Sequence, residues 1–271
     1  MILKKSKMTE LSRTTHLGIG AHPDDLEIMA AHGIISCFDR DDLWFGGVIL
    51  TDGAGSPRSP QTQALSESEF IHARENEQLA ASQLGQYSFV KCLRLSSTNL
   101  KSRDNQVPVD EIKKILLETL PSVIYLHNPF DRHDTHVAAC GLSLRALWEI
   151  RDIHQPEKIY GCEVWRDLDW LPDSVKSVLD LSKHEDLQRK LISCFSSQIA
   201  DAKRYDVGTM GRRQGHATFS ESKSLDQISL ATYALDLTPV VQSDSFDLKG
   251  FTDEILNSFL KETRRAIDQF C

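Results

Sequence analysis

Short apolar runs alternate with segments of helical periodicity through the first 165 residues of the chain. The helical spacing is clear in segment 25–38, where Leu26, Met29 and Ile34 share one face. The predicted strands are 16–21, 43–51, 89–95, 123–126 and 159–165. The predicted helices are 25–38, 67–84, 109–120 and 137–150. This alternation is typical of an α/β protein with a mainly parallel sheet that helices cover on both faces.

The pattern changes after residue 165. Two long helical stretches, 186–205 and 254–270, predict a C-terminal helical elaboration. Between them, segment 206–216 carries glycines, two arginines and a histidine, and it is predicted to be a flexible loop. The sequence has no linker-like stretch and no internal repeat. Residues 16–271 are therefore predicted to form one domain, after a flexible leader at residues 1–15.

Composition and charge exclude several classes of protein. The chain has 271 residues, of which 40% are hydrophobic and 26% are charged, as in an ordinary globular protein. No apolar run approaches the roughly 20 residues that span a bilayer. The net charge of −8 and the lack of a long basic run argue against nucleic acid as a partner. Six scattered cysteines without a C-x-x-C pair indicate reduced thiols and a cytoplasmic location. The sequence does not decide whether the chain forms a homo-oligomer.

Three polar segments follow predicted strands directly. They are 22–27, 52–57 and 131–136. In a parallel sheet the carboxyl ends of the strands meet on one rim, and α/β proteins bind their ligands there. We therefore expect the three segments to lie together and to form an active site.

The first and third of these segments contain residues that bind divalent metals. His22, Asp24 and Asp25 lie in the first, and His133 and His136 lie in the third. A catalytic zinc takes three protein ligands and keeps a position for water, and two histidines with one carboxylate supply such a set. A neighbouring carboxylate that is not a ligand can take the proton of that water. Near a helix start, histidines three residues apart lie on one side, so one can bind metal while the other donates a proton.

Each of these segments also has a structural interpretation. The first can be a helix N-terminus with Asp24 or Asp25 as its cap, and a histidine pair on a surface helix is often structural. A site of two histidines and one carboxylate with open positions also suits Fe²⁺. Because both segments follow strands and precede helices, a metal site is the favoured interpretation.

Four further residues are candidates for contacts with a substrate. Arg74 lies in a helical stretch among glutamates, where a surface ion pair is the alternative. Asp52 begins the second polar segment, where a simple turn is the alternative. Arg212 and Arg213 follow a glycine and suit a phosphate or a carboxylate, with a solvated basic loop as the alternative.

Taken together, the two metal-binding segments resemble the LmbE-like, or PIG-L, family of zinc-dependent N-deacetylases. The likeness rests on Ala21-His22-Pro23-Asp24-Asp25 and His133-Asp134-Thr135-His136, beside the family patterns A-H-P-D-D-E and H-x-x-H. Supporting matches are Thr51-Asp52-Gly53, Arg74-Glu75-Asn76-Glu77, Leu84-Gly85, Tyr160-Gly161-Cys162-Glu163-Val164-Trp165 and Ser197-Gln198. The resemblance covers residues 16–200 of the chain.

The resemblance implies a Rossmann-like α/β fold and zinc-dependent removal of an acetyl group from an N-acetylglucosamine-type sugar. By matching position, the zinc ligands would be His22, Asp25 and His136. Asp24 would be the general base, and Arg74 would contact the substrate. His133 would stabilise the tetrahedral intermediate or protonate the leaving amine.

The sequence departs from the family pattern at two positions. Leu26 stands where the family has a glutamate, and Glu27 follows one residue later. Thr135 stands where many members have an aspartate that orients the catalytic histidine, and Asp131 or Asp134 would take over that role. The alternative functions are an amidase or deacylase of an amino-sugar conjugate and a non-catalytic sugar-binding protein.

Overall fold

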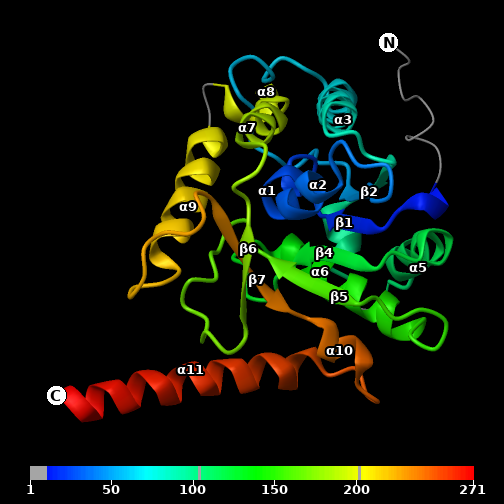
Figure 1. Ribbon diagram of the computed structural model, residues 1–271. Helices are drawn as coiled ribbons and strands as arrows, with labels where there is room; N and C mark the ends of the chain where they lie inside the picture. Colours follow the sequence, from blue (N-terminus) through cyan, green and yellow to red (C-terminus); the bar gives the residue numbers. More distant parts are fainter. Residues whose placement is uncertain (1–10, 103–104, 201–202) are drawn as a thin grey trace.

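A central sheet organises the protein (Figure 1). The computed structural model describes residues 11–102, 105–200 and 203–271. Within these ranges, one seven-stranded sheet has the order β3-β2-β1-β4-β5-β7-β6. The strands are β1 (His16–Gly20), β2 (Phe45–Thr51), β3 (Phe89–Leu95), β4 (Val123–His127), β5 (Lys158–Cys162), β6 (Lys176–Asp180) and β7 (Ala231–Asp236). β1 to β5 pair in parallel, whereas β7 is antiparallel to β5 and β6. The predicted mainly parallel sheet is confirmed.

Helices cover both faces of this sheet, as the alternating pattern predicts. One face packs against α5 (Val107–Thr119), α6 (Asp134–Glu149) and α10 (Thr238–Gln242). The other face packs against α1 (Asp25–Met29), α2 (Ala31–Cys37), α3 (Glu67–Leu84) and α7 (Glu185–Ser193). The remaining described helices are η2 (Leu11–Arg13), α4 (Ser97–Leu100), α8 (Ser196–Ile199), α9 (Tyr205–Phe219) and α11 (Leu248–Phe270). Side chains alternate between the two faces of the sheet along each strand, so the strands contribute to a hydrophobic core on each face. Ile19 of β1 lies in the core on the α5 and α6 face, and Ile49 of β2 lies in the core on the α1 and α2 face.

Two glycines let α1 lie directly on the sheet. A Cβ added at Gly18 would come within 2.8 Å of Leu26, and one added at Gly47 would come within 2.7 Å of the same side chain. Leu26 is fully buried in the space that these glycines leave. Position 26 thus faces the apolar core, which explains why a leucine stands where the family pattern has a glutamate. The close approach also holds the N-terminal residue of α1, Asp25, at the rim of the sheet.

Segment 206–216, predicted to be a flexible loop, is helical and belongs to α9. Met210, Arg213 and Ala217 are buried at helical spacing, so this helix has a face that packs against the body of the protein. The glycines that suggested a loop lie on the open side, because a Cβ at Gly208 or Gly211 would meet no atom within 4 Å. Burial of one face therefore outweighs the low helix propensity of glycine.

The predicted long helix 186–205 is interrupted. α7 ends at Ser193 and α8 begins at Ser196. Between them, Phe195 has a ψ of 57°, which is not helical, and its side chain is buried in the core. The chain turns here, and this turn allows the aromatic ring to be buried away from solvent. Residues 201–202 of the predicted helix lie outside the described residues.

Residues 11–15 of the predicted leader make contacts with the sheet. Leu11–Arg13 form a 3₁₀ turn, and the buried Thr14 hydroxyl lies 2.8 Å from that of Ser88. Thr15 N–H donates to the carbonyl of Trp44 beside the start of β2. This part of the chain is thus tied to the sheet, while residues 1–10 of the predicted leader lie outside the described residues.

The predicted strand 159–165 ends early, and the C-terminal helix begins early. β5 stops at Cys162 because the next side chain, Glu163, is buried as an acceptor for Leu168 N–H and Tyr233 N–H. α11 starts at Leu248, and Figure 1 shows it running along the outside of the molecule to the C-terminus. None of the described helices is both long and apolar enough to cross a membrane.

Candidate metal and catalytic site

The three polar segments that follow β1, β2 and β4 meet at one cavity, as predicted. The cavity has a volume of about 820 Å³. Its wall includes His22, Asp24 and Asp25 from the first segment, Ser56 from the second and His133 from the third. The carboxyl ends of parallel strands deliver these side chains to the same rim.

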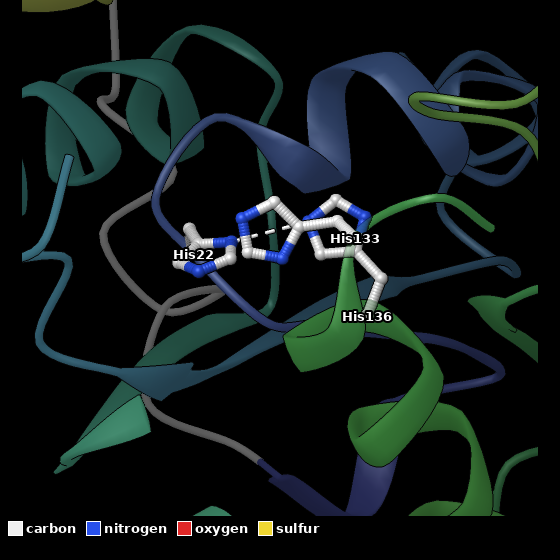
Figure 2. Close-up of side chains that lie close together, drawn as sticks. All are labelled: His22, His133 and His136. Atoms are coloured by element: carbon white, nitrogen blue, oxygen red, sulfur yellow. Dashed lines mark hydrogen bonds between the residues drawn. The ribbon is translucent and has the colours of Figure 1, made fainter. Parts of the chain in front are cut away.

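Two histidine nitrogens and the two carboxylate oxygens of Asp25 converge beside this cavity. His22 Nδ1 lies 3.2 Å from His136 Nε2 and 3.3 Å from Asp25 Oδ2, and His136 Nε2 lies 3.4 Å from Asp25 Oδ1. Figure 2 shows the two imidazole rings directed at one another, with His133 beside them. A tetrahedral zinc with bonds of about 2.0–2.2 Å keeps its ligands roughly 3.4 Å apart. The spacing and the donor types are therefore compatible with a divalent metal ion.

The structure also brings two further histidines to this place. Its overlapping groups of candidate ligands are His22 with His133 and His136, and Asp25 with His127 and His136. His127 Nε2 accepts a hydrogen bond from Ala21 N–H at 3.0 Å, so its lone pair is already engaged. His133 Nδ1 accepts from Thr135 N–H at 3.3 Å, which leaves its Nε2 to carry the proton. We call His22, Asp24, Asp25, His133 and His136 the catalytic cluster.

The protonation states of the ligand side chains favour metal binding. Burial by itself raises the pKa of Asp25, but the facing His136 and His127 outweigh it and hold this pKa well below its ordinary value. Burial lowers the pKa of His136 to about 4. An ionised carboxylate and a neutral imidazole are the forms that bind a divalent cation.

Asp131 orients His136 rather than the ring of His133. Its Oδ2 lies 3.3 Å from His136 Nδ1, which turns His136 Nε2 toward the other ligand atoms. The other oxygen, Oδ1, accepts from the backbone N–H of His133 at 3.1 Å. Asp134 is exposed in the first turn of α6. Of the two aspartates proposed to replace the family's orienting residue, only Asp131 is placed to align a histidine of the cluster.

Asp24 stands beside the ligands in an unusual backbone conformation. Its φ is 96°, in the left-handed region, and its N–H donates to Gln78 Oε1 at 3.3 Å. The side chain receives a hydrogen bond from Arg74 Nη2 at 3.2 Å. Burial raises the pKa of Asp24 to about 7, which suits a group that exchanges protons near neutral pH. Neither Asp24 nor Asp25 caps a helix as the structural alternative required, since Asp24 makes no side-chain cap hydrogen bond and Asp25 accepts from His22 N–H.

Glu27 lies beneath this turn in a buried polar network. Its Oε1 accepts from Tyr87 OH at 2.7 Å and from Gln78 Nε2 at 2.8 Å. Gln78 in turn accepts from the N–H of Asp24, so the network supports the turn that carries the candidate base. Burial raises the pKa of Glu27 to about 7. The displaced glutamate of the motif is therefore a structural neighbour of the site.

Arg74 is a buried clamp between two loops, not a surface ion pair. Its side chain is 1% exposed. One end of its guanidinium donates to the carbonyl of Pro23 at 2.5 Å, and the other donates to the carbonyl of Gly53 at 3.0 Å and to the hydroxyl of Ser56. The segments after β1 and β2 are thus fixed to each other through α3. Arg74 also lines the cavity, where a contact with substrate stays a prediction.

Of the other predicted substrate residues, the structure places one at the cavity and two away from it. Asp52 accepts from Ala54 N–H at 3.0 Å within its own turn and is absent from the cavity wall. Arg213 is 2% exposed and donates to the carbonyls of Glu27 and Ile28 at 2.9 and 3.1 Å, so it fastens α9 to the end of α1. Arg212, one position earlier on the helix, does line the cavity.

Several residues of the cavity wall were missed in the sequence. They are Ser97, Lys101, Lys203, Arg204 and Tyr205. They come from short helices and from the start of α9, and no motif spacing marks them. The only available signal was the helical spacing of Met210, Arg213 and Ala217, which would have indicated α9 and its exposed side.

A mainly parallel sheet that carries two histidines and two aspartates after its strands defines an LmbE-like protein with a candidate metal site. Residues 17–147 match the family PIG-L, described as GlcNAc-PI de-N-acetylase. This match covers the two metal-binding segments, and it confirms the resemblance predicted from the motifs. A search of curated protein sequences gives no match.

Solved structures of the same fold include both deacetylases and a hydratase. The N,N'-diacetylchitobiose deacetylase of Pyrococcus horikoshii is 14% identical with a TM-score of 0.67, covering 92% of this chain and 94% of that chain. GalB, the 4-carboxy-2-hydroxymuconate hydratase of Pseudomonas putida KT2440, is 18% identical with a TM-score of 0.66, covering 86% and 99%. The zinc-inhibited form of the teicoplanin deacetylase Orf2 is 15% identical with a TM-score of 0.59, covering 82% and 97%. At these identities the likeness shows the fold.

Proposed function

We propose that the protein is a metal-dependent N-deacetylase that hydrolyses the acetamide of an N-acetylglucosamine-type sugar. The observation that carries this proposal is the convergence of His22, Asp25 and His136 with a further carboxylate, Asp24, at one cavity. The match of residues 17–147 to the PIG-L family and the deacetylases among proteins of the same fold support it.

His22, Asp25 and His136 would hold the ion, with zinc favoured over Fe²⁺. A bound divalent cation polarises a carbonyl and lowers the pKa of water. Two features of the residues support this choice. The ligand atoms already lie 3.2–3.4 Å apart, and Asp131 keeps the ring of His136 aligned. Nitrogen and carboxylate oxygen are the donors that zinc takes in catalytic sites.

Asp24 is assigned as the base that takes a proton from the attacking water. It lines the cavity next to the ligands, and Arg74 and Gln78 fix its side chain and backbone. The water oxygen forms a bond to the acetamide carbon, and the carbon–nitrogen bond then breaks. The proton held by Asp24 passes to the departing nitrogen, which leaves acetate and a free amine.

His133 is assigned to the carbonyl oxygen or the departing amine. Because its Nδ1 accepts from Thr135 N–H, its Nε2–H is free to donate into the cavity. Burial, followed by the facing His22, lowers the pKa of His133, so the ring is neutral at neutral pH. A neutral donor stabilises the negative charge that develops on the oxygen.

The experiment is an acetate-release screen over N-acetylated sugars with metal-quantified protein. We expect acetate and a free amino sugar in equal amounts, and we expect a chelator to abolish turnover until metal is restored. Mass spectrometry of the products separates this activity from that of an amidase or deacylase acting on a larger conjugate. Addition of water across a carbon–carbon double bond, with no acetate from any N-acetyl sugar, would overturn the proposal in favour of a hydratase.

A further inference from the structure

One wall of the cavity is formed by a helix face that lies outside the matched family region. Arg204, Gly208 and Arg212 are spaced four residues apart and all line the cavity, with Arg204 as the N-cap residue of α9 and the other two within the helix. Residues at this spacing lie on the same side of a helix. We call these three residues, with Lys203 before them, the α9 wall. Residues 203–212 lie outside the family match, which ends at residue 147.

The α9 wall carries positive charge in an acidic protein. Its three charged residues are Lys203, Arg204 and Arg212, and Lys101 joins them from α4. Among the described residues that line the cavity, the acids are Asp24 and Asp25, both in the catalytic cluster. The chain as a whole has 39 acidic and 31 basic residues. The positive charge of this wall is therefore opposite in sign to the net charge of the chain.

The guanidinium groups of this wall are available to a ligand. Arg212 uses Nη1 to donate to the carbonyl of Val164 at 2.7 Å, which fixes the side chain. Among the described residues, Nη1 is the only atom of this guanidinium with a hydrogen bond. Arg204 pairs with Asp206, but its side chain is 67% exposed, and such surface pairs exchange readily for a better anion. A planar guanidinium binds phosphate and carboxylate through two parallel hydrogen bonds.

The space between the two arginines is open. A Cβ added at Gly208 would meet no atom within 4 Å, so the helix backbone leaves room between Arg204 and Arg212. Trp165 stands beside this room, with Lys203 Nζ 4.8 Å from its ring centroid and Tyr205 edge-on to it at 5.8 Å. An aromatic wall suits the apolar face of a sugar ring, and the charges beyond it suit a negative substituent.

We propose that the α9 wall is a subsite for an anionic group, a phosphate or a carboxylate, borne by the N-acetylated sugar. This inference rests on the proposed function for the identity of the sugar, but the binding of the anion does not depend on turnover. A neutral N-acetyl sugar would leave Arg204, Lys203 and Arg212 without a ligand. An anionic sugar would place its reacting acetamide at the catalytic cluster and its charge at the α9 wall.

Gly208 offers a matched pair of variants for the test. Gly208→Glu puts a carboxylate into the open space, and Gly208→Gln puts a neutral side chain of nearly the same size there. Both side chains favour helix over glycine, so neither should impair folding of α9. Wild type and both variants are assayed on N-acetylglucosamine, N-acetylglucosamine 1-phosphate and N-acetylmuramic acid, which are neutral, phosphorylated and carboxylated.

In the wild type, kcat/KM for one of the two anionic sugars should exceed that for the neutral sugar by about tenfold or more, the scale of one hydrogen bond to a charged group. This ratio should fall in Gly208→Glu relative to Gly208→Gln, and it should fall again in Arg204→Gln/Arg212→Gln. Arg189→Gln, which alters an exposed arginine paired with Glu185 on α7, is the control and should keep the ratio. Which of the two anions is preferred identifies the group.

Equal ratios in Gly208→Glu and Gly208→Gln, or no preference for either anion in the wild type, would overturn the subsite. If no sugar releases acetate, the proposed function fails, and calorimetric titration with the same three sugars still decides the subsite. Tighter binding of an anionic sugar, weakened by salt and lost in Gly208→Glu, supports it. Equal binding of the charged and neutral sugars contradicts it.

Discussion

The catalytic cluster and the α9 wall face the same cavity but are built in opposite ways. The cluster is held by hydrogen bonds to buried side chains: Asp131 aligns His136, and Arg74 with Gln78 fixes Asp24. The α9 wall presents exposed or half-buried cations around a glycine, on a helix whose opposite side is buried against the body of the protein. In the proposed function, this contrast would separate chemistry from selection: a rigid set of residues would act on the acetamide, and an adaptable face would choose what the acetamide is attached to.

Removal of a ligand from the cluster should give the largest effect. His136→Ala deletes one of the converging ligand atoms, so we expect the protein to lose its metal and its activity to fall on the order of a thousandfold. Metal content by emission spectrometry and acetate release measure the two losses. His72→Gln, at a 61% exposed position on α3, is the control. Retention of full activity in His136→Ala would remove this residue from the ligand set.

Removal of the base should separate metal binding from catalysis. Asp24→Asn keeps the size of the side chain and tolerates the left-handed backbone, so we expect full metal content with a loss of a hundredfold or more in kcat, on the order found for general bases. Asp134→Asn, at an exposed position of α6, is the control. Asp24→Asn with wild-type kcat would show that another group takes the proton.

Arginines on the two sides of the cavity should differ in their effect on folding. Arg74→Met leaves the carbonyls of Pro23 and Gly53 and the carboxylate of Asp24 without a donor. Breaking such a buried cluster costs about 3–5 kcal/mol, so we expect a clear fall in the free energy of unfolding measured by urea denaturation. A loss below about 1 kcal/mol would mean that the loops after β1 and β2 hold each other without Arg74.

The smallest effect on folding should come from the α9 wall itself. Arg212→Met removes one hydrogen bond, to the carbonyl of Val164, from a half-buried side chain. We expect the free energy of unfolding to fall by only about 1 kcal/mol, measured by the same denaturation. A loss as large as that of Arg74→Met would show that Arg212 is a structural residue and that the contrast between the two regions does not hold.

The parallel part of the fold and the catalytic cluster were predictable because both depend on local patterns. Apolar runs of β1 and β2 are buried on both faces, and the segments that follow them reach the rim by topology alone. His22, Asp25 and His136 come from two contiguous motifs, so their types and spacing indicated the site. β6 and β7 were not predicted, because they pair antiparallel at the end of the sheet and β6 is largely exposed.

The different roles of neighbouring residues could not be predicted from the sequence. Arg212 and Arg213 looked equivalent in a loop, but on a helix they point about 100° apart, one into the cavity and one into the core. In the sequence, Leu26 was only a departure from the motif. In the structure, its side chain fills the space that Gly18 and Gly47 leave. Such roles depend on which face of an element is buried, and that is settled by contacts far apart in the chain.

The backbone conformation of Asp24 limits which amino acids evolution can place at that position. A φ of 96° is comfortable for glycine and tolerated by asparagine and aspartate, whose short polar side chains bond locally. Proton abstraction demands a carboxylate, which glutamate shares but glycine and asparagine lack. Aspartate alone meets both demands. The turn after β1 therefore restricts which amino acids can stand at position 24. A change to glutamate would be selected against here, even though it conserves the charge and would be tolerated at many surface positions.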